Sequence, residues 1–165
     1  MARYVALLRA ISNVSMAPFR EGMEELGYTE VASFGMSGNL IFTADGAGAG
    51  IDAMEERISR KLGAVAIVRS AKDMARAAKV DRFPGARWST VIFLARAPTA
   101  AERKRFLALD FAEPRPVLKG RDAFYAFPVA IKGKKANVDI EKAIGVTGTQ
   151  RTMRVVTRIA ELMRG

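Results

Sequence analysis

Short apolar runs alternate with amphipathic segments along the first half of the chain, and this order limits the fold more than any single motif. The run Arg3–Arg9 is apolar between two arginines, which is typical of a central strand buried on both faces. Helices are expected at about Pro18–Leu26 and Ile51–Leu62, where apolar residues recur at helical spacing and a glycine follows. The other strands are expected at about Glu30–Phe34, Asn39–Thr43 and Ala64–Val68. The order β-α-β-β-α-β predicts the split-βαβ arrangement of ferredoxin-like domains.

The second half repeats most of this order without obvious sequence repetition. After a short helix at Ala71–Ala78, the dipeptide Pro84-Gly85 marks a turn and the expected boundary between the halves. The following elements are expected to be a strand Thr90–Leu94, a helix from Pro98 to about Leu109, a hairpin Arg115–Lys119 and Asp122–Phe127, and a helix Gln150–Met163 with Thr149 as its N-cap. We therefore predict an α+β protein of two ferredoxin-like halves, residues 1–82 and 83–165, each with an antiparallel sheet and helices packed on it.

The absence of two residue types limits the catalytic and metal-binding chemistry that the chain can support. The chain has no cysteine and no histidine, which excludes thiol nucleophiles, disulfides, imidazole bases and the usual zinc sites. No Asp/Glu cluster has metal-like spacing. We expect no catalytic residue, no metal and no cofactor, and the interpretation leans away from an enzyme. An enzyme made from this chain would need carboxylates, Lys, Arg, Tyr, Ser/Thr or a bound cofactor. No apolar run is long enough to cross a bilayer, so no membrane partner and a cytoplasmic location are expected.

The positive charge is concentrated in the second half. Residues 1–82 hold 11 Lys and Arg against 10 Asp and Glu, whereas residues 83–165 hold 16 against 7. A basic half favours an anionic partner such as nucleic acid. Three groups could bind phosphates without reading sequence: Arg115, Lys119 and Arg121; Lys132, Lys134 and Lys135; and Arg151, Arg154 and Arg158, which fall within about 60° on a helical wheel. The alternative is that all of them are solvated surface charge.

The segment GMSGN, residues 35–39, lies between two expected strands. Its backbone N–H groups could form an anion-binding nest, with Ser37, Gly38 and Asn39 at the ligand and Arg9 supplying charge. A phosphate-binding P-loop is excluded, because a strand follows instead of a Lys-Ser/Thr ending and a helix. The alternative is a tight turn, for which Gly, Ser and Asn are standard. A small anionic ligand at this loop is the leading hypothesis for function, and nucleic-acid binding by the second half is the alternative.

Two further patterns are weaker. The glycines of Gly46–Gly50 do not have dinucleotide-binding spacing and indicate a surface linker. Tyr4 and Phe42 would sit on central strands, as base-stacking aromatics do in RNA-recognition domains, but the accompanying motif is absent and core positions are expected. An exposed sheet edge would also allow an oligomer.

Three segments, RYVALLRAI, MEELGYTEVASFGMSGNLIF and IGVTGTQRTMRVVTRIAEL, together resemble the domain-of-unknown-function family 1697. The resemblance implies an α+β protein of two ferredoxin-like halves, bacterial and cytoplasmic, with no established activity. The chain departs from the family pattern in two places. The family's Leu-Leu-Arg-Gly-Ile-Asn-Val-Gly-Gly is here Leu-Leu-Arg-Ala-Ile-Ser-Asn-Val-Ser, and its Thr-x-Arg-Asn-Trp is here Thr149-Gln150-Arg151-Thr152-Met153. The Ser37-Gly38-Asn39 element is retained.

Overall fold

The structure, a computed structural model, describes residues 1–45 and 50–164. The predicted linker Gly46–Gly50 therefore lies outside the described residues except for Gly50. The chain divides into two compact units, Met1–Arg76 with Thr157–Gly165, and Ala77–Val156. The expected domains, residues 1–82 and 83–165, stay a prediction, because compactness does not establish that a segment folds alone.

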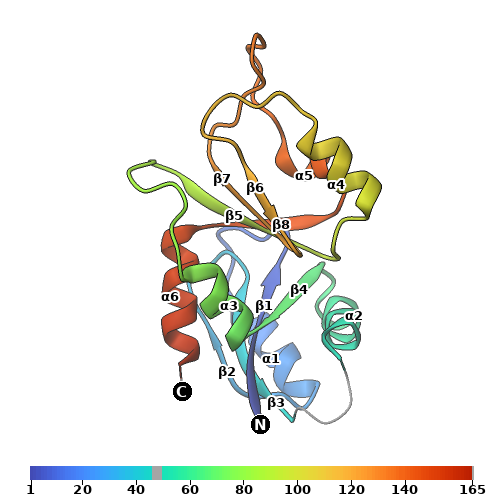
Figure 1. The fold of residues 1–165 in the computed structure, drawn as a ribbon. Helices are drawn as coiled ribbons and strands as arrows, with labels where there is room; N and C mark the ends of the chain where they lie inside the picture. Colours follow the sequence, from blue (N-terminus) through green and yellow to red (C-terminus); the bar gives the residue numbers. More distant parts are fainter. Residues whose placement is uncertain (46–49, 165) are drawn as a thin grey trace. The chain divides into compact units, whose positions relative to one another are not determined.

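The first unit holds a four-stranded antiparallel sheet with the strand order β2-β3-β1-β4 (Figure 1). Its elements are β1 (Ala2–Leu8), α1 (Ala17–Glu25), β2 (Thr29–Ser33), β3 (Asn39–Ala44), α2 (Ile51–Leu62), β4 (Ala66–Ser70) and α3 (Ala71–Ala78). Strand β1 is central, and Val5 lies opposite Ile41 on one side and Arg69 on the other. The residues Val5 to Leu8 are at most 1% exposed, which confirms the predicted strand buried on both faces.

Helices α1 and α2 pack on one face of this sheet. Met23 of α1 and Ile58 of α2 join Leu40 and Phe42 of β3 in one apolar cluster, and Phe42 is fully buried as expected. Helix α2 ends where the sequence predicts, at a glycine with a left-handed backbone (Gly63, φ 68°).

The second unit repeats this topology, with the strand order β6-β7-β5-β8. Its elements are β5 (Ser89–Leu94), α4 (Ala100–Leu107), β6 (Val117–Lys119), β7 (Asp122–Ala126), α5 (Ile140–Ile144) and β8 (Gly148–Thr152), followed by α6 (Met153–Met163). The fold class is therefore confirmed: an α+β chain with two antiparallel sheets, consistent with two ferredoxin-like halves. Helix α6 ends within the first unit, where the Arg3 guanidinium donates a hydrogen bond to the carbonyl of Leu162 (3.0 Å).

Three elements differ from the prediction: β8 and α5 are additional, and the last helix begins later. The last helix begins at Met153 rather than at Gln150, because Gly148–Thr152 forms β8 along the edge of β5. Thr149 is consequently a strand residue and not an N-cap. The short helix α5 was not predicted, although Asp139 caps it by accepting a hydrogen bond from the Lys142 N–H (3.1 Å). Among the described residues, none of the helices combines the length and hydrophobicity that a membrane span requires.

Candidate functional site

The loop at residues 35–39 connects β2 and β3, and its residues Gly38 and Asn39 have clear structural roles. The Leu8 N–H donates to the Gly38 carbonyl (2.8 Å), so the loop is tied to the end of β1. Gly38 has φ 80°, and a Cβ there would lie 2.7 Å from the Leu8 Cβ. The Asn39 side chain is 3% exposed and donates to the Phe34 carbonyl (3.0 Å). Gly38 and Asn39 therefore close the turn.

The same contact brings the other two predicted ligand residues together. Arg9 follows Leu8 and Ser37 precedes Gly38, so both belong to the end of the sheet where β1 meets the loop. Both residues are exposed, and the Arg9 N–H donates to the Val65 carbonyl (2.9 Å). Anion binding at Arg9 and Ser37 stays a prediction.

The basic residues of the second hairpin have different roles. Arg115 donates to the carbonyls of Leu107 and Leu109 (3.3 and 3.2 Å), and its guanidinium lies over the Phe111 ring. Arg121 bonds the carbonyls of Leu94 and Ala95 in the same way. These two arginines therefore tie chain segments together, whereas Lys119 is exposed on β6.

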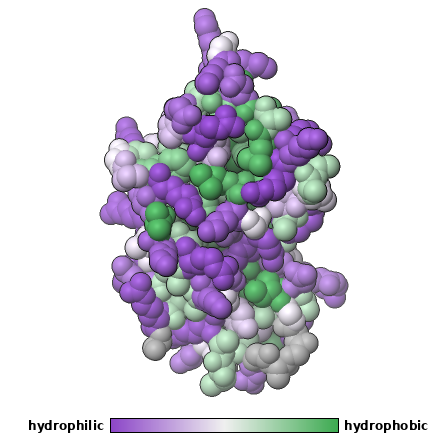
Figure 2. Space-filling view, viewed as in Figure 1, coloured by the Kyte–Doolittle hydropathy of each residue, from purple (hydrophilic) through white to green (hydrophobic). Residues whose placement is uncertain are grey.

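The loop between β7 and α5 carries the three predicted lysines. Lys132, Lys134 and Lys135 are all exposed, and only the first has an ion pair among the described residues, with Asp110 at 3.6 Å. Figure 2 shows the tip of this loop as a hydrophilic projection. The loop can therefore present positive charge to an anion.

The predicted helical stripe of three arginines is wrong for Arg151, because this residue belongs to β8. Arg151 is 8% exposed, and its guanidinium donates to the Thr149 hydroxyl and the Gln150 carbonyl, both at 2.7 Å. Burial lowers the Arg151 pKa to about 10, so the side chain remains charged at neutral pH. Arg154 is exposed on α6, and Arg158 pairs with Glu161 (3.2 Å). Phosphate binding by these residues stays a prediction.

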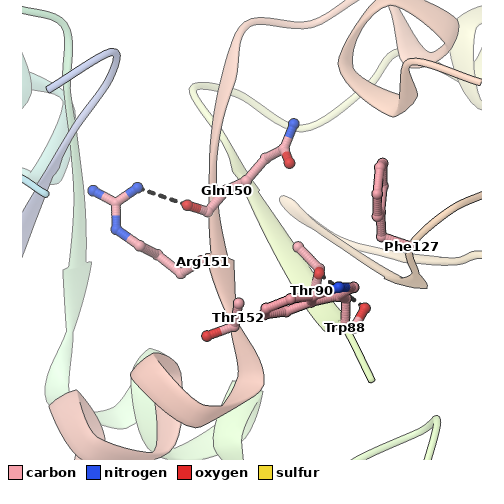
Figure 3. A pocket seen from close by; sticks show the side chains of 6 residues that line it. All are labelled: Trp88, Thr90, Phe127, Gln150, Arg151 and Thr152. Carbon is pink, nitrogen blue, oxygen red and sulfur yellow. Dashed lines mark hydrogen bonds between the residues drawn. The ribbon is translucent and has the colours of Figure 1, made fainter. Parts of the chain in front are cut away.

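A pocket of about 390 Å³ opens on the sheet of the second unit (Figure 3). Its lining comes from β5, β7 and β8 and the residues that flank them: Trp88, Thr90, Phe127, Gln150, Arg151 and Thr152. The pairing of the strands explains why these residues meet. Thr90 lies opposite Thr152, and the Phe127 N–H donates to the Trp88 carbonyl (2.9 Å).

The pocket exists because the helices cover only part of this face of the sheet. Alternate residues of β5 share a face, and Ile92 is buried there in one apolar cluster with Phe106 of α4 and Ile144 of α5. Helices α4 and α5 are short, and the end of the face that carries Trp88 lies outside this cluster. Trp88 is 45% exposed and Phe127 is 50% exposed, so two aromatic rings flank an open cavity.

The polar groups of the pocket are partly fixed by their neighbours. The Tyr125 hydroxyl donates to the Gln150 side-chain oxygen (2.6 Å). Burial, together with the nearby carboxylates of Asp139 and Glu141, raises the Tyr125 pKa, so this hydroxyl keeps its proton. The Gln150 amide nitrogen is then the group that a ligand can use. In Figure 3 the Arg151 guanidinium points to the opposite side of β8 from the two aromatic rings, so Arg151 lines the pocket without its charge facing them.

A cationic side chain also lies next to the aromatic side of the pocket. The Arg87 guanidinium lies 5.3 Å from the centroid of the Trp88 ring, a cation–π distance, and Arg87 itself is exposed. Within residues 1–45 and 50–164, no three Asp or Glu side chains converge as a metal site would require. The arrangement can therefore stack a planar ring and attract an anionic group. Sequence reasoning missed this site, and its only early signal was the single tryptophan next to an arginine.

Comparison with known proteins agrees with the family resemblance. Residues 1–124 match the family described as "Protein of unknown function (DUF1697)". The structure of the conserved bacterial protein SP0830 from Streptococcus pneumoniae is similar over 100% of this chain and 99% of that chain, with a TM-score of 0.68 and 16% identity. At this identity the likeness shows the fold alone. No curated protein matches the chain.

Proposed function

This chain belongs to the DUF1697 family of proteins of unknown function, and we propose that it binds single-stranded nucleic acid through the pocket of its second unit. The observation that carries the proposal is the pair of half-exposed rings, Trp88 and Phe127, beside an open cavity of about 390 Å³. This volume is within the roughly 300–1,000 Å³ of ordinary ligand sites. Stacking of a base on an aromatic side chain contributes about 1–3 kcal/mol and tolerates any base.

The charge of the surrounding surface supports an anionic ligand. Most of the net charge of +10 comes from residues 83–165, and the loop after β7 exposes three lysines. Arg87 can contact a phosphate next to a base stacked on Trp88, since its guanidinium already lies over that ring. Contacts of this kind do not depend on sequence and weaken steeply with salt. The cytoplasmic location expected from the sequence is part of this proposal.

The hypothesis of a small anion at Arg9, Ser37, Gly38 and Asn39 has less support. The Asn39 amide bonds Phe34, and Gly38 is packed against Leu8, so the turn itself explains both residues. Arg9 and Ser37 are both exposed side chains, so burial does not mark either as part of a site.

The proposal can be tested by fluorescence anisotropy with a labelled oligothymidylate of about ten nucleotides, a length within the usual site sizes. Trp88→Ala and Phe127→Ala should each weaken binding by about 5-fold to 150-fold, the equivalent of one lost stacking contact. Leu107→Ala is the matched control, because Leu107 is also apolar and 45% exposed and lies on α4 of the same unit.

Two outcomes would contradict the proposal. One is unchanged affinity in both aromatic variants, and the other is an equal loss in the Leu107 control. A thymidine mononucleotide is included as a competitor to separate the two sources of a phosphorylated base. If it competes as well, per molecule, as the oligonucleotide, the site recognises a free nucleotide and the nucleic-acid proposal is wrong.

A further inference from the structure

A second pocket, of about 210 Å³, lies within the first unit and has a different chemistry. It is formed by the turn between α1 and β2, the end of β3 and one side of α2. The side chains that matter here are Leu26, Tyr28, Asp45, Met54 and Arg57. They are independent of the nucleic-acid site proposed above, since every one belongs to the compact unit that begins at Met1.

Tyr28 is the first indication of a ligand. Its side chain packs on Phe42, with ring centroids 4.6 Å apart, and the residue is only 7% exposed. Its buried hydroxyl nevertheless has no hydrogen-bond partner in the part of the chain that the structure describes. Burial raises the Tyr28 pKa, which keeps the proton on the hydroxyl at neutral pH. A buried donor without an acceptor is uncommon and costs stability, so it calls for an explanation.

Arg57 provides a charge next to this hydroxyl-bearing ring. Its guanidinium lies 5.8 Å from the Tyr28 ring centroid, and one of its nitrogens donates to the Leu26 carbonyl (3.3 Å). A guanidinium has five N–H donors, so this one bond leaves Arg57 able to take both oxygens of a carboxylate. A phenol and a guanidinium that line one pocket together favour an anionic oxygen ligand.

The other residues that line the pocket restrict the class of ligand that fits it. Asp45 also lines the pocket, and a carboxylate in this position disfavours a simple anion and favours a ligand that also carries a cationic group. Leu26 and Met54 add apolar surface, and Met54 is 5% exposed. We propose that this pocket binds a free α-amino acid with a short apolar side chain. Its carboxylate faces Arg57 and Tyr28, its ammonium group faces Asp45, and its side chain packs between Leu26 and Met54.

The test is isothermal titration of the full chain with L-leucine and with two analogues that each lack one charged group. 4-Methylpentanoate lacks the ammonium group, and 3-methylbutylamine lacks the carboxylate. L-Leucine should bind, and each analogue should bind about tenfold to hundredfold more weakly, as expected when a charge-assisted hydrogen bond is lost. No heat from L-leucine at concentrations up to about 10 mM, or equal affinity for 4-methylpentanoate, would overturn the proposal.

Variants assign the binding to this pocket. Tyr28→Phe removes only the unpartnered hydroxyl, so the protein should fold at least as stably as the wild type while leucine binds more weakly. Arg57→Gln should also weaken leucine binding, whereas Arg60→Gln on the same helix should not, because Arg60 pairs with Glu56 at the exposed side of α2. Wild-type affinity in Tyr28→Phe and Arg57→Gln would place the ligand elsewhere and refute the inference.

Discussion

The two left-handed glycines of the loop at residues 35–39 give a matched pair of substitutions. Gly35 has φ 67° and Gly38 has φ 80°, so alanine at either position adopts a backbone conformation that costs about 1–2 kcal/mol. The two sites differ in the space around an added Cβ. At Gly35 nothing lies within 4 Å, whereas at Gly38 the Leu8 Cβ lies at 2.7 Å and the Ile11 Cβ at 3.2 Å.

The contact at Gly38 adds an overpacking cost to the backbone cost. Leu8 is 1% exposed in the central strand, and its N–H bonds the Gly38 carbonyl, so neither side can move freely. Overpacking of this kind costs about 1–3 kcal/mol. Gly38→Ala should therefore lower the free energy of unfolding by about 2–5 kcal/mol, and Gly35→Ala by about 1–2 kcal/mol.

Urea unfolding followed by circular dichroism measures both variants against the wild type. The difference between the two variants is the informative quantity, because the backbone cost is common to both. Equal destabilisation would refute the argument that Gly38 is needed for close approach to β1.

Three other perturbations follow from the second unit. Thr99→Ala removes the capping box of α4 and should cost about 1 kcal/mol in urea unfolding. The hydrogen bond from Arg96 lowers the Glu102 pKa from 4.5 to about 2, so the stabilisation by this carboxylate is present above pH 4.5 and is lost as pH falls toward 2. Glu102→Gln should therefore lower the melting temperature at pH 7 and have less effect at pH 2; an effect that grows on acidification would contradict this sign. Replacing Lys132, Lys134 and Lys135 together by alanine should reduce the salt dependence of oligonucleotide binding, with the slope of log K against log salt smaller by up to about 2. An unchanged slope would show that these lysines do not contact phosphate.

Elements with local signals were predictable from the sequence. Helix α2 has an apolar stripe and a glycine stop, and the structure gives the predicted range Ile51–Leu62. Strand β1 is a short apolar run, and it lies at the centre of its sheet as expected. Such patterns depend on neighbouring residues alone, so one sequence is enough to read them.

Strand β8 had no local signal. The segment GTQRT contains no large apolar residue, and it is a strand because it pairs with β5. For the same reason the sequence predicts Arg151 on a helix flank: its spacing with Arg154 is helical, but pairing with β5 makes this segment extended. The burial of Arg151 is likewise a tertiary effect and opposes the usual preference of arginine for the surface.

The candidate site depends on pairing between strands and was not predictable. Trp88 and Phe127 are remote in sequence and meet because β5 pairs with β7. Their exposure depends on how far the short helices α4 and α5 extend over the sheet, which no residue pattern near Trp88 indicates. The GMSGN loop lies between two strands, as the sequence predicts. The structure shows in addition that Gly38 packs against Leu8 and that Asn39 bonds the Phe34 carbonyl within the turn.

The most direct test of the proposed function uses the only tryptophan of the chain. Because the sequence contains one tryptophan, the intrinsic tryptophan fluorescence of the protein reports on Trp88 alone. Titration with unlabelled oligothymidylate should quench this fluorescence saturably, and the quenching midpoint should move to higher oligonucleotide concentration in Phe127→Ala. Binding detected by anisotropy without any change in Trp88 fluorescence would show that the nucleic acid does not enter this pocket.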